Sequence, residues 1–249
     1  MRLFSRRFAF LLWIADACCF AVVLFYPVSL GLTRACGVAL AGLLAAGLLL
    51  LWWRHRFLRW MMLVLFATVA MFAVLPGRTD YDRAGLREEV VQALQRYEET
   101  PYVWGGENFL GIDCSGLVRR GAIDGMFLYG VRTLNPLLVR KSFTLWWRDL
   151  SAQDMETGAR GAAKKITEEK SLALLNDKNL HPGDFAVTRG GAHALVFLGG
   201  HFWIEADPGE RKVISLDARK TKNGWFQQPV SILRWRFLET PYRAGRTRD

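Results

Sequence analysis

Cysteine is scarce in this chain, with four residues in 249, and this scarcity excludes a fold held together by disulfides. Cys18, Cys19 and Cys36 lie in apolar stretches, where a thiol packs as a small hydrophobic group. Cys114 is therefore the one cysteine in the polar part of the sequence, with no second thiol there to pair with. We expect it to be kept for its reactivity.

Acidic residues are almost absent from the first 76 residues, which contain seven arginines and a single acid, Asp16. Residues 77–249 carry 26 basic and 22 acidic residues, so most of the net charge of +10 belongs to the first 76. Neither part shows a DNA- or RNA-binding motif or the spacing of metal ligands. We therefore predict no nucleic-acid partner and no metal or organic cofactor.

Residues 1–76 consist mostly of long apolar runs. Three segments, at about 8–30, 35–53 and 57–76, are long enough to cross a hydrocarbon core about 30 Å thick. A cleaved signal peptide is the alternative for the first segment, but no small-residue cleavage site follows it and two more spans do. The sequence thus predicts a membrane anchor of about three helices, followed by a linker at 77–83.

The arginines predict which side of the membrane holds the rest of the chain. One cluster precedes the first span and a second separates the second span from the third, whereas Arg34 alone lies between the first and second spans. The clusters are Arg2, Arg6 and Arg7, and Arg54, Arg56 and Arg59. Because cytoplasmic loops are enriched in basic residues, an odd number of spans places the remainder outside a bacterial cytoplasmic membrane.

Two amphipathic helices are expected at the start of the polar domain, which we place at residues 84–240. Apolar residues recur at helical spacing over 83–99, with Asp82 as the N-cap. A second helix is expected from Cys114 to about Phe127.

The rest of the domain is predicted to be a helical insertion and a sheet. The insertion, at about 134–178, contains a charged run at 164–170 that looks helical. Five short strands are expected after a Pro-Gly turn, at 185–188, 192–198, 202–206, 211–216 and 230–237. Helices first and an antiparallel sheet second give an α+β fold, with a tail at 241–249.

Two motifs surround the lone thiol, YVWGG at 102–106 and DCSG at 113–116. Asp113 is a good N-cap, so Cys114 is expected in the first turn of a helix. There the exposed N–H groups and the helix dipole favour a thiolate over a thiol. The same N–H groups, that of Ser115 among them, point to where an oxyanion would form during attack on an amide.

A thiolate nucleophile needs a base beside it, and residues 77–249 offer three histidines. His181 precedes a Pro-Gly turn and His201 lies at the tip of a predicted hairpin, which favours structural or solvated roles. His193 begins the strand at 192–198 and is the candidate base. The alternative is that His193 is a buried core residue of that strand.

The group that orients the imidazole is expected on the next strand, where Glu205 and Asp207 are the candidates. Strand side chains alternate between faces, so the hairpin loop decides between them. With residues 198–200 as the loop, Glu205 lies opposite His193, and with 199–201, Asp207 does. A two-residue loop puts both acids on the wrong face.

In this order, YVWGG, DCSG, GDFAV at 183–187 and HALVFLGG at 193–200 resemble the NlpC family of cell-wall cysteine peptidases, which have a papain-like core. The resemblance covers about residues 84–240. It implies Cys114 as the nucleophile, His193 as the base and Glu205 as the third residue. Tyr102 resembles an active-site tyrosine of the family.

Two departures from the family pattern stand out. Glutamate occupies the third position, where the family usually has histidine, and the stretch between Cys114 and His193 is longer than usual. The resemblance implies hydrolysis of amide bonds in peptidoglycan stem peptides, commonly between D-glutamate and a diamino acid, without a cofactor. The alternatives are an acyltransferase, thioesterase or amidase of the same fold acting on a lipid or another amide, and a non-catalytic wall-binding domain.

Overall fold

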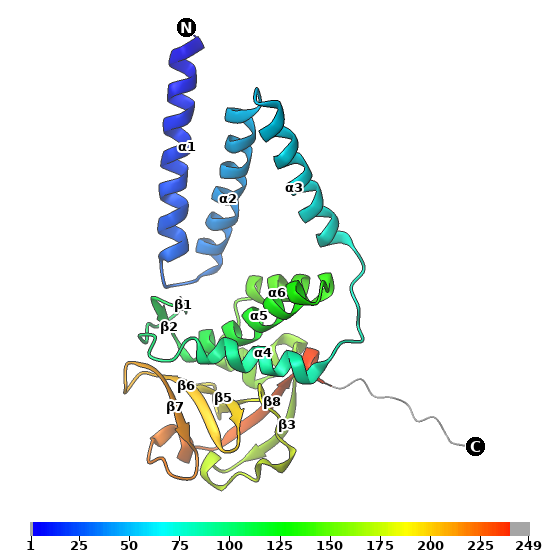
Figure 1. The fold of residues 1–249 in the computed structure, drawn as a ribbon. Helices are drawn as coiled ribbons and strands as arrows, with labels where there is room; N and C mark the ends of the chain where they lie inside the picture. The colour runs from blue at the N-terminus through cyan, green and yellow to red at the C-terminus, as the bar shows by residue number, and fades with distance from the viewer. Residues whose placement is uncertain (1, 240–249) are drawn as a thin grey trace, which may run out of the picture.

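Three long apolar helices stand on one side of a domain of helices and strands in the computed structural model, which describes residues 2–239 (Figure 1). They are α1 (Arg2–Phe25), α2 (Gly31–Trp52) and α3 (Arg56–Val74), and each is long and apolar enough to cross a membrane. The three predicted apolar segments are thus helical. Helix α1 ends at Phe25 rather than at residue 30 because the next residues contact the domain. Residue 240 and the predicted tail at 241–249 lie outside the described residues.

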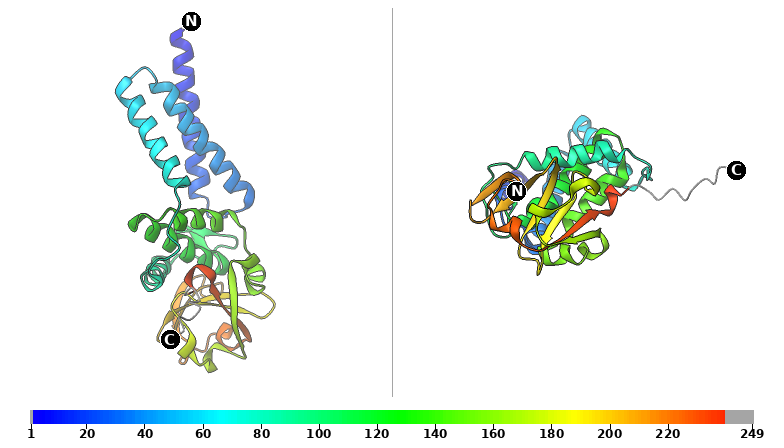
Figure 2. Two further views of the ribbon diagram at one scale, coloured as in Figure 1. Left: turned by 90° about the vertical axis from the view of Figure 1, so that its right-hand side faces the viewer. Right: turned by 90° about the horizontal axis from the view of Figure 1, so that it is seen from below.

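Helices α1 and α2 pack together, whereas α3 diverges from α2 below their shared turn (Figures 1 and 2). Trp13 Nε1 donates a hydrogen bond to the carbonyl of Leu44 over 3.0 Å. The same indole lies against Gly47, where a Cβ would come within 2.4 Å of the ring. The aromatic ring and the glycine therefore fix the approach of the two helices.

The domain has four helices, which are α4 (Arg83–Gln95), α5 (Cys114–Arg132), α6 (Pro136–Trp147) and α7 (Ala152–Glu156). Of these, α4, α5 and α6 lie between the apolar helices and the sheet (Figure 1), while α7 contacts strand β4 (Phe185–Thr188). Asp82 caps α4 as predicted, accepting hydrogen bonds from the N–H groups of Ala84 and Gly85. Helix α5 runs five residues beyond the predicted end at Phe127 and packs along both α4 and α6.

An antiparallel sheet forms the other layer, which confirms the predicted α+β fold. Its strand order is β3-β8-β4-β5-β6-β7, and a separate short hairpin pairs β1 with β2. The strands are β1 (Glu107–Asn108), β2 (Gly111–Ile112), β3 (Ala163–Glu169), β4 (Phe185–Thr188), β5 (Ala194–Gly199), β6 (Phe202–Asp207), β7 (Lys212–Asp217) and β8 (Val230–Trp235).

The prediction of a helix for the charged run at 164–170 is wrong, because this segment is strand β3 at the edge of the sheet. It pairs with β8 along its length, and most of its charged side chains face solvent. Charged residues suit an edge strand, since they discourage pairing with another chain. Backbone pairing with β8, which lies far away in the sequence, outweighs the local preference for a helix. The insertion is therefore only partly helical.

Close contact between α4 and α5 depends on Gly125. A Cβ at this position would lie 2.7 Å from Val90 Cα and 2.9 Å from its backbone nitrogen. We predict that Gly125→Ala lowers the free energy of unfolding by about 1–3 kcal/mol. Alanine's better helix propensity, about 1 kcal/mol, opposes this loss but does not remove a clash with backbone. Thermal unfolding of the full chain in detergent tests it.

Gly224→Ala is the matched control, because a Cβ there meets nothing within 4 Å. An unchanged melting temperature in Gly125→Ala would contradict the described contact between the two helices.

Candidate active site

The thiol of Cys114 lies at the first residue of α5, and Asp113 caps this helix as predicted. Asp113 Oδ1 accepts hydrogen bonds from Gly116 N at 2.6 Å and from Ser115 Oγ at 2.9 Å. Its other oxygen accepts from Gly105 N at 2.8 Å. One carboxylate therefore joins the start of the helix to the loop that carries the YVWGG motif.

Two backbone N–H groups stay open beside the sulfur. Within residues 2–239, the N–H groups of Cys114 and Ser115 donate to no protein acceptor, whereas Asp113 accepts from Gly116. The Ser115 hydroxyl is taken up by the cap, so this residue offers its backbone rather than its side chain. Such paired donors at a helix start are suited to an oxyanion.

Gly116 permits a tight approach of this helix start to the preceding loop. A Cβ at Gly116 would lie 2.3 Å from the carbonyl oxygen of Gly106. The DCSG glycine is thus required by packing, because no side chain fits between the two segments.

His193 is buried, at 1% exposure, and three residues hold its backbone and its ring. Thr188 binds its backbone, with Oγ1 accepting from His193 N at 2.9 Å and the Thr188 N–H donating to His193 O at 2.9 Å. His193 Nε2 lies 2.6 Å from Glu205 Oε2. The indole of Trp225 stacks on the ring, with 4.3 Å between centroids and an interplanar angle of 17°.

The hairpin between β5 and β6 brings the acids to the side of His193. The tip is a two-residue turn at 200–201, which alone would place both acids on the opposite face. A register shift at Leu198 adds one residue to β5, so that Val196 lies opposite Ile204. This bulge restores the shared face.

The register beyond the bulge matches the predicted 199–201 loop, which places Asp207 across from His193. Glu205 nevertheless makes the hydrogen bond to the ring. Asp207 instead accepts from Asn223 Nδ2, and the same amide also donates to Glu205 Oε1 at 3.1 Å. Asn223 therefore links the two carboxylates, and Asp207 helps to position Glu205 through this shared amide.

The electrostatics of this group favour a charged imidazole. Burial lowers the pKa of His193, but hydrogen bonds and charge attraction from Cys114 and Glu205 outweigh it and raise that pKa to about 9. Glu205 is fully buried, and burial raises its pKa while the charge of His193 lowers it. His193 thus interacts with both Cys114 and Glu205.

Tyr102 is half-buried beside the same charges. Burial raises the pKa of its hydroxyl, and the negative charges of Cys114, Asp113 and Asp207 raise it further. The hydroxyl therefore stays protonated at neutral pH and can donate a hydrogen bond to a developing anion.

Sequence reasoning missed three residues of the site, Thr188, Asn223 and Trp225. Asn223 caps the short turn Gly224–Gln227, where its side chain accepts from Trp225 N at 2.9 Å. An asparagine before a glycine signals a turn in the sequence, but nothing there indicates that the turn folds over His193.

The loop of the YVWGG motif is also held from the membrane side. The connection between α1 and α2 pairs with it as a short strand would, because Ser29 N donates to Gly105 O at 2.9 Å. Glu107 N donates in turn to Pro27 O at 2.9 Å. The apolar hairpin therefore contributes backbone contacts to the loop that precedes the nucleophile.

No family model matches the chain. A curated relative, dipeptidyl-peptidase 6 of Lysinibacillus sphaericus, is 54% identical over 50 residues, which are 20% of this chain. The chain spans 18% of the length of that relative.

Three solved structures illustrate the structural similarity. An NlpC/P60 family protein from Bacillus cereus is 14% identical at a TM-score of 0.40, over 60% of this chain and 40% of that one. NlpC2 from Trichomonas vaginalis is 19% identical at 0.41, over 63% and 49%. The peptidoglycan hydrolase RipB from Mycobacterium tuberculosis is 19% identical at 0.40, over 67% and 74%. The first of these structures is described as an NlpC/P60 family protein, which is the family named from the motifs of this chain.

The raised pKa of His193 gives a direct test. We predict that the His193 ring titrates near pH 9 in the full chain, as followed by NMR of ¹³C-labelled histidine. In Glu205→Gln the carboxylate attraction is lost, and the midpoint falls toward the ordinary value of 6.5. The stabilisation from this charged ring is complete below pH 6.5 and is lost as the pH rises through 9.

His181→Asn serves as the control that assigns the signals, since His181 lies in the turn before β4 and outside the site. A wild-type midpoint at or below 6.5 would contradict the charged pair.

Proposed function

We propose that this chain is a membrane-anchored cysteine peptidase that hydrolyses amide bonds of peptidoglycan stem peptides. One observation carries the proposal. Cys114 lies at a capped helix start, next to the buried and hydrogen-bonded pair of His193 and Glu205. Peptidoglycan hydrolases are among the proteins of similar structure, which supports the same substrate class.

The first step is attack on the amide carbonyl. The Cys114 thiolate forms the carbon–sulfur bond, while the carbonyl electron pair moves to oxygen. The open N–H groups of Cys114 and Ser115 and the Tyr102 hydroxyl hold the resulting oxyanion. Asp113 acts indirectly, because it positions the helix start and the glycine loop.

Collapse of that intermediate breaks the carbon–nitrogen bond. The His193 imidazolium gives its proton to the leaving amine, and neutral His193 then takes a proton from water as water attacks the thioester. The carbon–sulfur bond then breaks, which releases the product acid and restores the Cys114 thiolate beside the His193 imidazolium. Glu205 keeps the ring oriented and compensates its charge in both half-reactions, with Asn223 and Asp207 holding Glu205 in place. In this proposed reaction the thiolate is the nucleophile and the imidazole moves the protons, so neither step requires a metal ion.

The expected location is the outer side of a bacterial cytoplasmic membrane. The start of α1 and the turn between α2 and α3 lie at the end of the apolar helices that is remote from the domain (Figure 1). The start of α1 and this turn are both rich in arginine, which favours a cytoplasmic location for that end of the helices. The domain then meets the cell wall, where the proposed substrate lies.

The decisive test is digestion of isolated cell wall by the full chain in detergent. We predict that Cys114→Ser lowers the release of muropeptides by at least about 10³-fold, because the hydroxyl is a far weaker nucleophile than the thiolate. The released peptides, sequenced by mass spectrometry, identify the bond that is cut.

Cys36→Ser is the matched control, since Cys36 is an exposed residue of helix α2. Equal release by Cys114→Ser and wild type would refute the role of Cys114. Turnover of a lipid ester or amide without any muropeptide release would favour a lipid-directed acyl transferase or amidase instead.

A further inference from the structure

A cavity of about 440 Å³ lies where the membrane hairpin meets the domain. Its volume falls in the range of about 300–1,000 Å³ that is typical of small-molecule sites. One part of its wall is apolar and comes from the last turns of α1 and the first turns of α2, with Val23, Leu24 and Val38 among the lining residues. The other part is polar, with Arg34 and Arg120.

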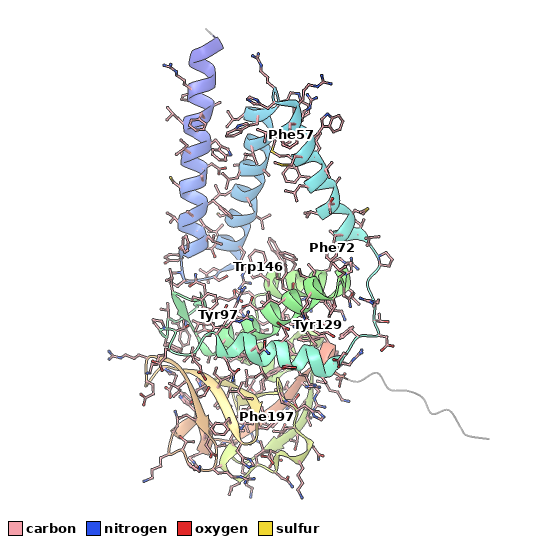
Figure 3. All side chains as sticks on the ribbon, in the orientation of Figure 1. Phe57, Phe72, Tyr97, Tyr129, Trp146 and Phe197 are labelled. Atoms are coloured by element: carbon pink, nitrogen blue, oxygen red, sulfur yellow. The ribbon has the colours of Figure 1, made fainter. Side chains whose placement is uncertain are left out.

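Arg34 is the centre of the polar part and is 97% buried, as its exposure of 3% shows. Its Nη2 donates to Glu107 Oε2 at 2.7 Å, and its Nε donates to Ser29 Oγ at 2.9 Å. Trp146 of α6 covers the guanidinium, with 6.0 Å from Cζ to the ring centroid. Figure 3 shows Trp146 between α6 and the lower end of α2. A cation so deeply buried at the start of a membrane helix is held in place by the domain below it.

Two guanidinium nitrogens of the cavity lack an acceptor. Arg34 Nη1 is buried and has no hydrogen-bond partner among residues 2–239. Arg120 donates from Nε to Tyr97 and from Nη2 to Asp124, which leaves its Nη1 without an acceptor in the same part of the chain. An unpartnered buried donor is rare in proteins, so Arg34 Nη1 points to an acceptor supplied by a ligand, and the part-exposed Arg120 guanidinium offers a second donor beside it.

We propose that this cavity binds a phospholipid, whose phosphate accepts hydrogen bonds from Arg34 and Arg120. The polar part lies where α1 ends and α2 begins, which is where lipid headgroups would meet two membrane-spanning helices, and the apolar part lies on the adjoining turns of both helices. Guanidinium groups recognise phosphate with charge-assisted hydrogen bonds. A detergent or diacylglycerol supplies the chains but no phosphate.

The bound lipid braces the nucleophile's loop. Arg34 holds Glu107, and Glu107 belongs to the loop whose Gly106 oxygen touches the start of α5 at Gly116. Arg119 of α5 joins the same cluster, with Nε 3.5 Å from Glu107 Oε1. A phosphate on Arg34 therefore steadies the segment that positions Cys114. This link is independent of peptidoglycan cleavage, because it concerns the thiol itself.

Native mass spectrometry of the delipidated full chain tests binding, with phosphatidylglycerol, diacylglycerol of the same chains, and inorganic phosphate as separate probes. We expect phosphatidylglycerol to bind at least about tenfold more tightly than diacylglycerol, and Arg34→Gln to remove the difference. Ala41→Phe, which fills the apolar wall, is expected to displace the lipid without touching the ion cluster.

Gly42→Phe is the matched control, because a Cβ at Gly42 meets nothing within 4 Å and Gly42 does not line the cavity. Equal binding of diacylglycerol, unaltered binding in Ala41→Phe, or a second polypeptide in place of lipid would overturn the site. Binding of free phosphate as tight as that of the lipid would overturn a lipid ligand.

The link to the thiol is read from the rate of Cys114 alkylation by iodoacetamide near pH 7. We expect phosphatidylglycerol to raise this rate in wild type and in Arg34→Lys, but not in Arg34→Gln or Ala41→Phe. A rate that does not respond to phosphatidylglycerol would overturn the bracing of the loop.

Discussion

The hydrogen bond between His193 and Glu205 is the interaction on which the site depends. Both side chains are almost fully buried, and a buried charge is tolerated only where a partner compensates it. Asn223 binds the second carboxylate oxygen, and Trp225 covers the ring and keeps water away. The sheet holds His193 and Glu205 in place, and the start of α5 positions the Cys114 sulfur beside them.

Glutamate is the hydrogen-bond partner of His193 at the position where the family that the motifs resemble more often has histidine. A carboxylate is a stronger partner for an imidazolium, and it holds the charged ring with a raised pKa of about 9. The cost of burying this acid is offset by Asn223, which also joins it to Asp207. A short 3₁₀ turn outside the sheet thus completes the group.

The apolar helices are more than a tether. The α1–α2 connection adds a strand-like segment beside the YVWGG loop, and Arg34 of α2 forms an ion pair with Glu107 inside the domain. Arg140 of α6 in turn donates to the carbonyls of Ala73 and Leu75 at the end of α3. The domain therefore contacts the apolar helices both at the α1–α2 connection and at the end of α3.

The sequence by itself determined the features that depend on local chemistry. Apolar length predicted the three long helices, and Asp113 followed by Cys114 predicted a capped helix start, since capping depends on neighbouring residues. Alternation and turn residues predicted five of the six strands of the main sheet.

Tertiary structure decided what depends on contacts between distant segments. The bulge at Leu198 set the face of Glu205, and pairing with β8 turned the charged run at 164–170 into a strand. Asn223 reaches Glu205 and Trp225 reaches His193 only through the folded chain, as Arg34 reaches Glu107 across 73 positions. Such contacts leave no periodic or local pattern, because their energy comes from groups that only folding brings together.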